Sequence, residues 1–167
     1  MEDNIVIRVK LGVKDLYSFL LRYNYGNFGG IFGVIISLAS FIFLGMTYAS
    51  NSTTTNIILV FVGLLWTVIQ PLLLLQRAAQ QATKNVAYKE VLEYEWKEEG
   101  VSLRLDGQEE MIPWEGIIKV VETKKHILVY TSRIHACILP KAQFKEQLAS
   151  VKGWLTRKLD KSLCKLK

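Results

Sequence analysis

The chain has 167 residues, half of which are apolar, and its formal net charge is +6. Its two cysteines, Cys137 and Cys164, lie far apart and in no CxxC pattern, which argues against a disulfide framework or a cysteine zinc site. No Asp, Glu, Lys or Arg occurs in the 54 residues from Tyr23 to Gln76, which argues against an ordinary water-soluble domain there, because such a domain needs a charged outer face.

Residues 1–30 predict an N-terminal strand followed by a lead-in helix. Apolar and polar side chains alternate over residues 5–11, which is the period of a half-buried strand. Residues 13–26 then place apolar side chains at helical spacing. We expect this helix to be amphipathic and to lead into a membrane, with its tyrosines near the headgroups.

Two apolar segments, residues 31–48 and 57–75, follow with a short uncharged linker between them. They have 18 and 19 residues, and roughly 17 to 25 are needed to cross a bilayer. Because backbone groups in a bilayer must be paired internally, we predict two helices that form a transmembrane hairpin over residues 31–75. A cleaved signal peptide is not expected, since the first segment begins about 30 residues into the chain and no convincing cleavage site follows.

Lys and Arg residues flank the hairpin on both sides, and its linker carries none. By the positive-inside rule, both termini are expected in the cytoplasm and the chain is expected to cross the membrane twice.

Two features of the hairpin suggest helix packing and bending. Gly29 and Gly33 form a GxxxG pattern, which allows close helix approach and is a weak signal for dimerisation. Gln70 and Pro71 interrupt the second segment, and Pro71 is expected to kink the helix because it removes a backbone hydrogen bond.

Residues 76–89 are rich in helix formers and predict a helical stalk, and residues 90–167 predict a β domain that ends in a helix. Six short alternating segments lie between residues 92 and 140, with a hairpin signal at Asp106-Gly107. With the N-terminal strand they make seven. The expected fold is therefore an α+β membrane protein whose cytoplasmic part is a pleckstrin-homology-like (PH-like) antiparallel β-barrel closed by a C-terminal helix. That helix is predicted from an apolar stripe that runs from Phe144 to Leu166.

The excess positive charge is concentrated in residues 141–167, which hold eight basic and two acidic residues. A membrane anchor would hold this region near anionic lipid, where each nearby Lys or Arg gains about 1 kcal/mol. An ordinary solvated helix face is the competing interpretation. The residues proposed for membrane or partner contact are Lys141, Lys145, Lys152, Arg157 and Lys158.

Residues typical of catalysis occur, but not in a catalytic pattern. His126 and His135 are expected to be solvated or on a strand surface, and a nucleophilic pair of His135 with Cys137 has no orienting third group. The acidic residues between 93 and 99 are expected on the wet face of a strand. We therefore predict no enzyme activity, catalytic residue, metal site or cofactor, and no nucleic-acid partner.

The order of elements and the motifs Ile-Pro-Trp, Ile-Ile-Lys-Val-Val-Glu-Thr and Ile-Leu-Pro-Lys-Ala-Gln-Phe resemble the YcxB-like membrane proteins of bacteria. The resemblance is most specific over residues 90–150. It implies a PH-like C-terminal domain and a bacterial cytoplasmic membrane location, and it implies no catalytic residues. The residues that carry it are Gly100, Trp114, Ile118, Val120, Glu122, Thr123, Leu139, Pro140, Lys141 and Phe144.

The function expected from these features is non-enzymatic. A membrane hairpin would present the PH-like domain on the cytoplasmic face for protein binding or complex assembly, with a protein partner or a second copy as the ligand. The alternative is an anionic-lipid-binding or membrane-sensing domain that uses the basic C-terminal helix.

Overall fold

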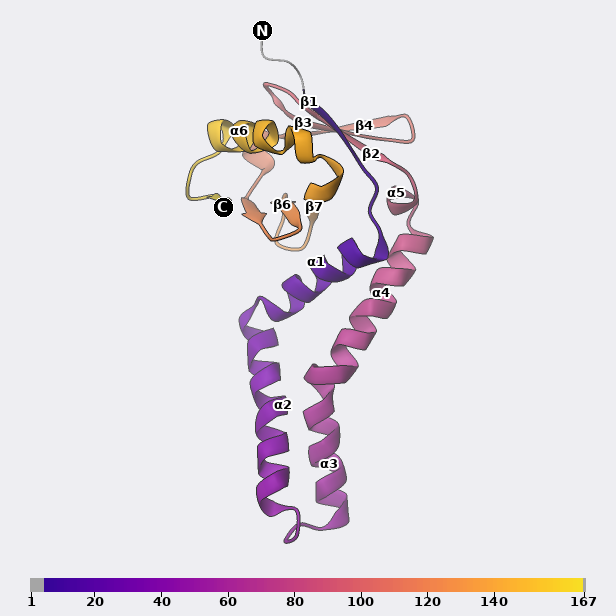
Figure 1. The fold of residues 1–167 in the computed structure, drawn as a ribbon, viewed down its shortest axis with the longest axis vertical. Coiled ribbons are helices and arrows are strands. Elements are labelled where there is room, and N and C mark those ends of the chain that lie inside the picture. The colour runs from indigo at the N-terminus through magenta and orange to yellow at the C-terminus, as the bar shows by residue number, and fades with distance from the viewer. Residues whose placement is uncertain (1–4, 167) are drawn as a thin grey trace. The chain divides into compact units, whose positions relative to one another are not determined.

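The computed structural model describes residues 5–166, and the chain divides into two compact units (Figure 1). The helical unit runs from Tyr17 to Gln80. The β unit is formed by the chain before Tyr17 together with the chain after Gln80. The β unit therefore joins two parts of the sequence that the helical unit separates.

The helical unit contains most of the charge-free sequence. After α1 (Val13–Tyr25) come α2 (Phe28–Thr47), α3 (Thr53–Leu64), a five-residue π-helical segment (Leu65–Ile69) and α4 (Gln70–Lys84). Side chains cap the first turns of α2 and α3. Asn27 accepts a hydrogen bond from the backbone of Gly30 at the start of α2, and Ser52 accepts one from Thr55 at the start of α3.

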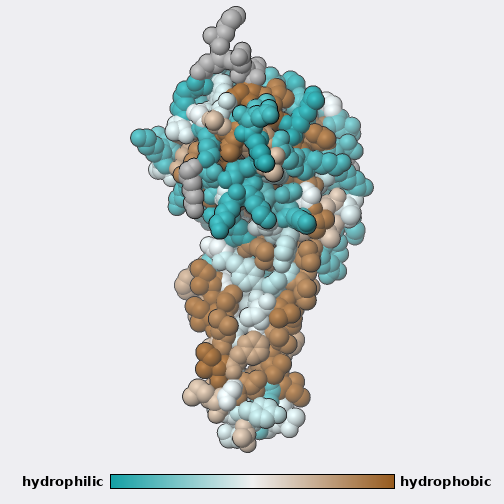
Figure 2. Space-filling view, viewed as in Figure 1, coloured by the Kyte–Doolittle hydropathy of each residue, from teal (hydrophilic) through white to brown (hydrophobic). Residues whose placement is uncertain are grey.

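Two helices are long and apolar enough to cross a membrane, one over Phe28–Thr47 with 20 residues and one over Thr53–Lys84 with 32. Both predicted segments lie almost entirely within these helices, and the second helix continues past residue 75 to Lys84, as expected. Their outward side chains are apolar and exposed. Figure 2 shows hydrophobic residues over α2 and α3. Phe28, Ile42 and Ile57 are among the exposed apolar residues of these helices.

A π-helical segment, Leu65–Ile69, lies before Pro71, where a kink was predicted. The backbone N–H of Gln70 donates to the carbonyl of Leu65, five residues earlier. A proline cannot donate to the carbonyl four residues before it and clashes with that group, and a π-turn relieves both problems by widening the helix.

The first sheet of the β unit has the order β1-β2-β3-β4 and is antiparallel throughout. It contains β1 (Ile5–Val9), β2 (Leu92–Trp96), β3 (Gly100–Leu105) and β4 (Gln108–Pro113). Asp106 and Gly107 form the predicted two-residue turn with φ of 48° and 77°, values that Asp tolerates and Gly adopts freely. Pairing of β1 with β2 places the N-terminal strand beside residues far along the chain.

The second sheet has the order β7-β6-β5-β8. It contains β5 (Lys119–Glu122), β6 (His126–Tyr130), β7 (Ala136–Pro140) and the two-residue β8 (Cys164–Lys165). All seven predicted strands are present. The eighth was not predicted, and it pairs parallel to β5. The described residues thus form two four-stranded sheets rather than one bent seven-stranded sheet, and they show no closed barrel.

The predicted C-terminal helix is shorter than its apolar stripe. Helix α6 covers Leu148–Lys158, and the chain before it forms short 3-10 turns over Lys141–Gln143 and Lys145–Gln147. After α6 the backbone carbonyl of Leu163 accepts a hydrogen bond from Val120 at 2.8 Å, and β8 completes the edge of β5. The prediction of helix to Leu166 is wrong because this strand edge takes the last residues out of the helix.

The core of the β unit lies between its elements. Helix α6 contributes Val151 and Leu155, each 0% exposed, and the two sheets contribute Val9, Val120 and Leu139, which are also 0% exposed. Between α4 and β2 the short α5 (Val86–Lys89) follows a break in the helix at Asn85. A 3-10 turn at Trp114–Gly116 links the sheets. At the level of fold class, the α+β prediction is confirmed.

Candidate functional site

The outer face of the first sheet carries a network of ion pairs. Glu93 pairs with Arg8 on β1 at 2.9 Å, and Arg104 on β3 reaches both Glu95 at 3.0 Å and Glu109 at 3.4 Å. Lys97 joins Glu95 to Glu109, with both distances at 3.2 Å. The alternation predicted for β2 is confirmed, since its apolar side chains are buried while its glutamates are partly exposed. Its acidic residues are thus paired with neighbouring strands.

Glu109 is the most strongly held carboxylate of this network. The buried hydroxyl of Ser102 donates a hydrogen bond to it, and Lys97 and Arg104 lie beside it. These contacts, that of Ser102 first, lower the pKa of Glu109 to about 2. The carboxylate therefore stays ionised at physiological pH and ties β4 to β3.

A second acidic residue, Glu122 at the end of β5, lies deeper in the β unit. Its side chain is 5% exposed and pairs with Lys141 at 2.9 Å and Lys152 at 2.7 Å. Lys141 follows β7 and Lys152 lies in α6, so this one carboxylate connects β5 to two later elements. Glu122 and Lys141 are also among the residues that carry the family resemblance.

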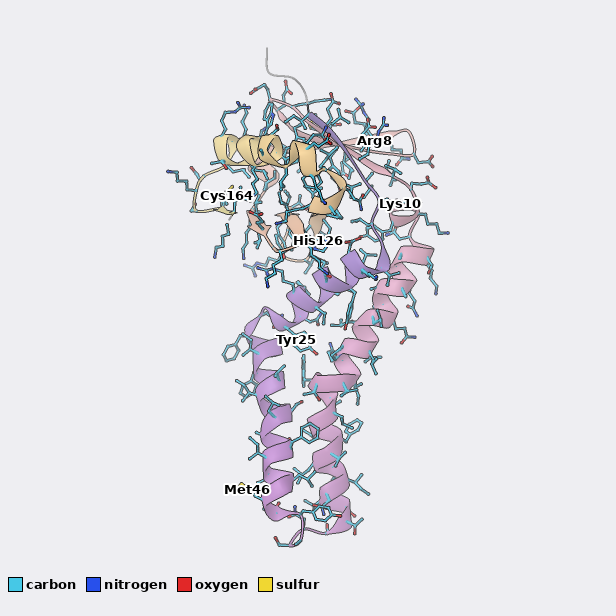
Figure 3. The ribbon with its side chains drawn as sticks, in the orientation of Figure 1. Arg8, Lys10, Tyr25, Met46, His126 and Cys164 are labelled. Carbon is cyan, nitrogen blue, oxygen red and sulfur yellow. The ribbon has the colours of Figure 1, made fainter. Side chains whose placement is uncertain are left out.

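The turn between β5 and β6 is held from both sides. Thr123 donates its N–H to the carbonyl of His126 and accepts the N–H of His126 on its side-chain oxygen, both at 2.8 Å. The ring Nε2 of His126, which is labelled in Figure 3, lies 2.7 Å from Oδ1 of Asp15 in the first turn of α1. His126 is 5% exposed, so the expectation of a solvated or surface histidine is wrong. Asp15 is 111 positions away, and no local pattern reveals this partner.

Three tryptophans join the first sheet to α6. The rings of Trp96 and Trp114 have centroids 6.0 Å apart, and Trp114 stacks on Trp154 of α6 with centroids 6.2 Å apart. The indole N–H of Trp114 lies within hydrogen-bonding distance of the carbonyls of Lys97, at 3.2 Å, and Glu98, at 3.0 Å. Trp114 is buried and anchors the end of β4, and Arg157 lies 4.4 Å from the centre of the Trp154 ring.

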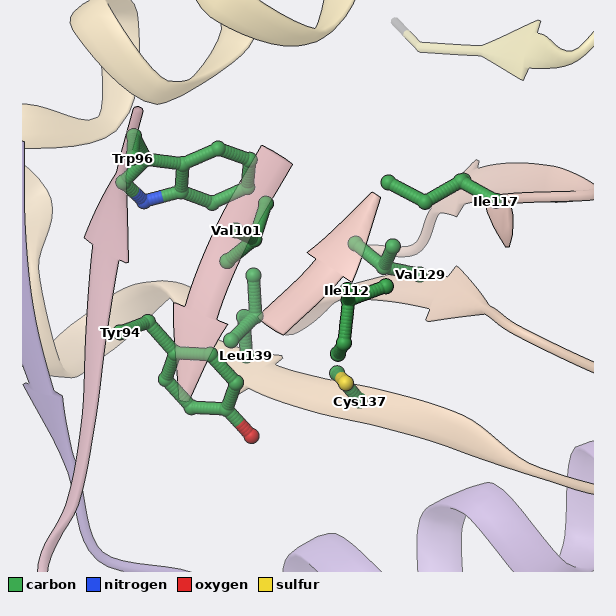
Figure 4. A pocket seen from close by; sticks show the side chains of 8 residues that line it. All are labelled: Tyr94, Trp96, Val101, Ile112, Ile117, Val129, Cys137 and Leu139. Atoms are coloured by element: carbon green, nitrogen blue, oxygen red, sulfur yellow. The ribbon is translucent and has the colours of Figure 1, made fainter. Parts of the chain in front are cut away.

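An apolar pocket lies between the two sheets (Figure 4). Its cavity volume is about 10 Å³, about the room for one water molecule. Burial raises the pKa of the Cys137 thiol in this pocket to about 11, so the thiol is protonated at neutral pH and is a poor nucleophile. His135 lies outside β7 and is exposed. The lining residues are Tyr94, Trp96, Val101, Ile112, Ile117, Val129, Cys137 and Leu139.

Four of the five basic residues predicted for membrane or partner contact have partners within the β unit. Lys141 and Lys152 pair with Glu122, and Lys158 pairs with Glu98. Arg157 packs on Trp154, whereas Lys145 is exposed. Most of the charge that the sequence suggested for an external ligand therefore has contacts within the β unit.

Gly33 packs inside the helical unit. A Cβ atom built on Gly33 would lie 2.3 Å from the indole of Trp66, so only glycine fits at this position without movement of the ring. Gly29, its partner in the GxxxG pattern, is exposed. This face of α2 is thus occupied at Gly33 by a side chain of the same molecule.

A small polar cluster surrounds the π-helical segment. The hydroxyl of Tyr25 donates to the carbonyl of Trp66 at 2.5 Å, and the hydroxyl of Ser37 donates to that of Val62 at 3.0 Å. Ser37 is 0% exposed and also accepts the N–H of Trp66 at 3.3 Å. Backbone groups that the widened helix leaves without their usual partners are paired in this way.

Among residues 5–166, no group of three His, Cys, Asp or Glu side chains is arranged to hold a metal ion. The polar clusters found here are ion pairs and hydrogen bonds between elements.

Comparison with protein-family models matches residues 96–155 to the family described as YcxB-like protein. The matched segment begins at Trp96 in β2 and ends at Leu155 in α6, entirely within the β unit. Neither the curated proteins nor the solved structures give a match to the chain. The resemblance seen in the sequence is therefore confirmed over this segment, which is similar to that family.

Proposed function

We propose that this protein is a membrane-anchored, non-enzymatic module that presents its β unit for protein binding or complex assembly. The observation that carries the proposal is the difference between the exposed surfaces of the two units. The helical unit exposes apolar side chains along α2 and α3, while the β unit pairs its charges and buries its own core.

The anchor in this proposal is a transmembrane hairpin formed by α2 and the helix Thr53–Lys84. Lys and Arg occur on both sides of the hairpin and are absent from residues 48–56, which supports a cytoplasmic location for both termini. The bacterial cytoplasmic membrane is the compartment proposed from the family resemblance.

We also propose that the β unit is PH-like. Four consecutive strands form one antiparallel sheet and the next three form a second, and α6 follows them. The tryptophan stack from Trp96 through Trp114 to Trp154 joins α6 to the first sheet, as a closing helix requires.

The surface proposed for a protein partner lies at the end of the second sheet. Ile118 is 46% exposed, and its N–H bonds to Tyr130 at the end of β6. Ile134, in the turn that follows β6, is 58% exposed. Exposed aliphatic side chains on a backbone held by hydrogen bonds are suited to burial under a partner.

The test is purification of the tagged full-length protein from its own host in mild detergent, followed by mass spectrometry and sizing. A stoichiometric partner, or a complex of several copies, is expected for the wild type. The double variant Ile118→Ser/Ile134→Ser should lose it, whereas Met111→Ser, which changes another exposed apolar residue, should keep it. Recovery of the wild type as a lone monomer would contradict the proposal.

The alternative is a domain that binds anionic lipid through the basic C-terminal helix. Lys145 is exposed on this part of the chain, but Lys141, Lys152 and Lys158 are engaged by Glu122 and Glu98. The ion pairs make the helix itself the weaker candidate for a lipid surface.

A further inference from the structure

The tip of the turn between β5 and β6 consists of two adjacent lysines. Lys124 and Lys125 are both exposed, and the residues on either side of them are fixed. Thr123 and His126 close the turn through one backbone hydrogen bond and two that involve the Thr123 hydroxyl, which donates to the His126 carbonyl and accepts the His126 N–H. The backbone carbonyl of Lys125 also accepts the N–H of Lys141 at 2.9 Å. The two ammonium groups are therefore presented from a rigid support, so little backbone order is lost when they bind a ligand.

The acidic groups nearest this turn already have cationic or histidine partners. Glu122 is held by Lys141 and Lys152, and Asp15 lies 2.7 Å from Nε2 of His126. Lys14, which is also exposed, stands next to Asp15 in the first turn of α1. The turn thus carries two exposed lysines beside two acidic groups that already have partners, although residues 76–140 as a whole hold nine basic and ten acidic residues.

The turn is also tied to the part of the chain that leads into the first apolar helix. The His126–Asp15 contact fixes the turn to the first turn of α1. Helix α1 ends at Tyr25 and α2 begins at Phe28, so a single helix and two linking residues connect this site to the proposed anchor. A bilayer that holds α2 is therefore joined to the turn through one helix of the chain.

We propose that Lys124 and Lys125, supported by Lys14, form a contact site for the phosphate groups of anionic lipids in the membrane that holds the hairpin. The proposal rests on the membrane anchoring proposed above, and it places the lipid contact at this turn instead of on α6. An ammonium group suits a headgroup phosphate as a point charge, and the anionic inner surface of a membrane attracts such groups. A membrane surface is favoured over an acidic protein because the site is tethered to the apolar hairpin.

The test compares three full-length proteins. These are the wild type, Lys124→Gln/Lys125→Gln, and the control Lys161→Gln/Lys165→Gln, which removes the same charge from two exposed lysines after α6. Each is first floated with vesicles of phosphatidylcholine alone, which depends on the hairpin. Each is then titrated in mild detergent with phosphatidylglycerol, or with phosphatidylcholine of the same chain length, and bound lipids are counted by native mass spectrometry.

We expect all three proteins to float. The turn variant should bind phosphatidylglycerol about 5- to 30-fold more weakly than the wild type, since each lysine near an anionic surface contributes about fivefold. Its affinity for phosphatidylcholine should not change, and the control should stay within about twofold of the wild type, a margin well below the effect of one such lysine.

Two results would overturn the inference while leaving the anchor intact. One is flotation of all three proteins with equal affinity for phosphatidylglycerol. The other is an equal loss of affinity in the turn variant and the control, which would show only a general effect of net charge. Loss of a co-purifying acidic protein without loss of lipid would assign the turn to a protein partner. Failure of the wild type to float would instead reject the proposed anchoring, and the lipid site with it.

Discussion

The helical unit exposes apolar side chains, whereas the β unit buries them and exposes charged ones. Along α2 and α3 the exposed side chains are Ile, Leu, Phe and Val, and the buried residues include Ser37 and the glycines at positions 30, 33 and 63 (Figure 2). In the β unit the buried residues are mostly aliphatic or aromatic, and the exposed ones are mainly lysine and glutamate.

This difference teaches how each unit achieves a specific structure. In the helical unit, burial of apolar surface cannot favour helix pairing if lipid surrounds it, so close packing and internal hydrogen bonds must do so. Gly33 against Trp66 and Ser37 against Val62 are contacts of that kind. The β unit combines an apolar core with ion pairs that connect strands distant in sequence. The two units should therefore respond to different perturbations.

The largest effect is expected from Gly33→Leu. The new side chain would overlap the indole of Trp66, and overpacking of this kind costs up to about 3 kcal/mol. The thermal midpoint of the helical signal, followed by circular dichroism in mild detergent, should fall.

The matched control is Gly45→Leu, because a Cβ at Gly45 has no atom within 4 Å. This change should be neutral or stabilising, since leucine favours helix more than glycine by about 0.8 kcal/mol. Equal losses in the two variants would show that Gly33 does not pack against Trp66.

The next effect is expected from Glu122→Gln in the β unit. The change removes the charge that holds Lys141 and Lys152, and hydrogen bonds to charged groups contribute about 1.5–3 kcal/mol. Unfolding of the purified protein in urea, followed by tryptophan fluorescence, should move to lower denaturant concentration.

Glu99→Gln, which changes an exposed acidic residue in the turn before β3, serves as the control and should unfold like the wild type. If Glu122→Gln unfolds at the wild-type midpoint, the central role given to Glu122 in joining β5 to α6 is wrong.

A smaller, pH-dependent effect is expected at Glu109. Folding lowers its pKa from 4.5 to about 2, chiefly through Ser102 and then Lys97. The folded state therefore favours the carboxylate, and the resulting stability is fully present above about pH 4.5 and is lost as the pH falls through 2.

Unfolding midpoints of the wild type and Glu109→Gln at pH 6 and pH 3 measure this effect. The difference between the two proteins should be larger at pH 6 than at pH 3, and high salt should reduce it because the network is exposed. A difference that grows as the pH falls would contradict the low pKa.

The smallest effect is expected in the rate at which the two thiols are alkylated, a measurement that does not involve protein stability. Burial raises the pKa of Cys137 to about 11 and also raises that of Cys164. Alkylation of the folded protein at pH 7.5 should therefore be slow at both thiols, with Cys137 the slower. Rapid and selective modification of Cys137 would reopen the nucleophile hypothesis.

Much of the fold could be predicted because it depends on local patterns. Alternation located all seven strands from β1 to β7, and the absence of charge located both long apolar helices. Asp106-Gly107 predicted a turn from its own backbone preferences. These properties depend on near neighbours in the chain, so they are visible in the sequence.

The sites depended on contacts that no local pattern contains. The sequence indicated that residues 141–167 are basic, but only the tertiary structure pairs Lys141 and Lys152 with Glu122. The tertiary structure also brings the His126 ring to Asp15 and places Leu163 and β8 along the edge of β5. Secondary structure follows from periodicity and turn chemistry, whereas the partner of a charge or a strand edge is decided by which distant segments the folded core brings together.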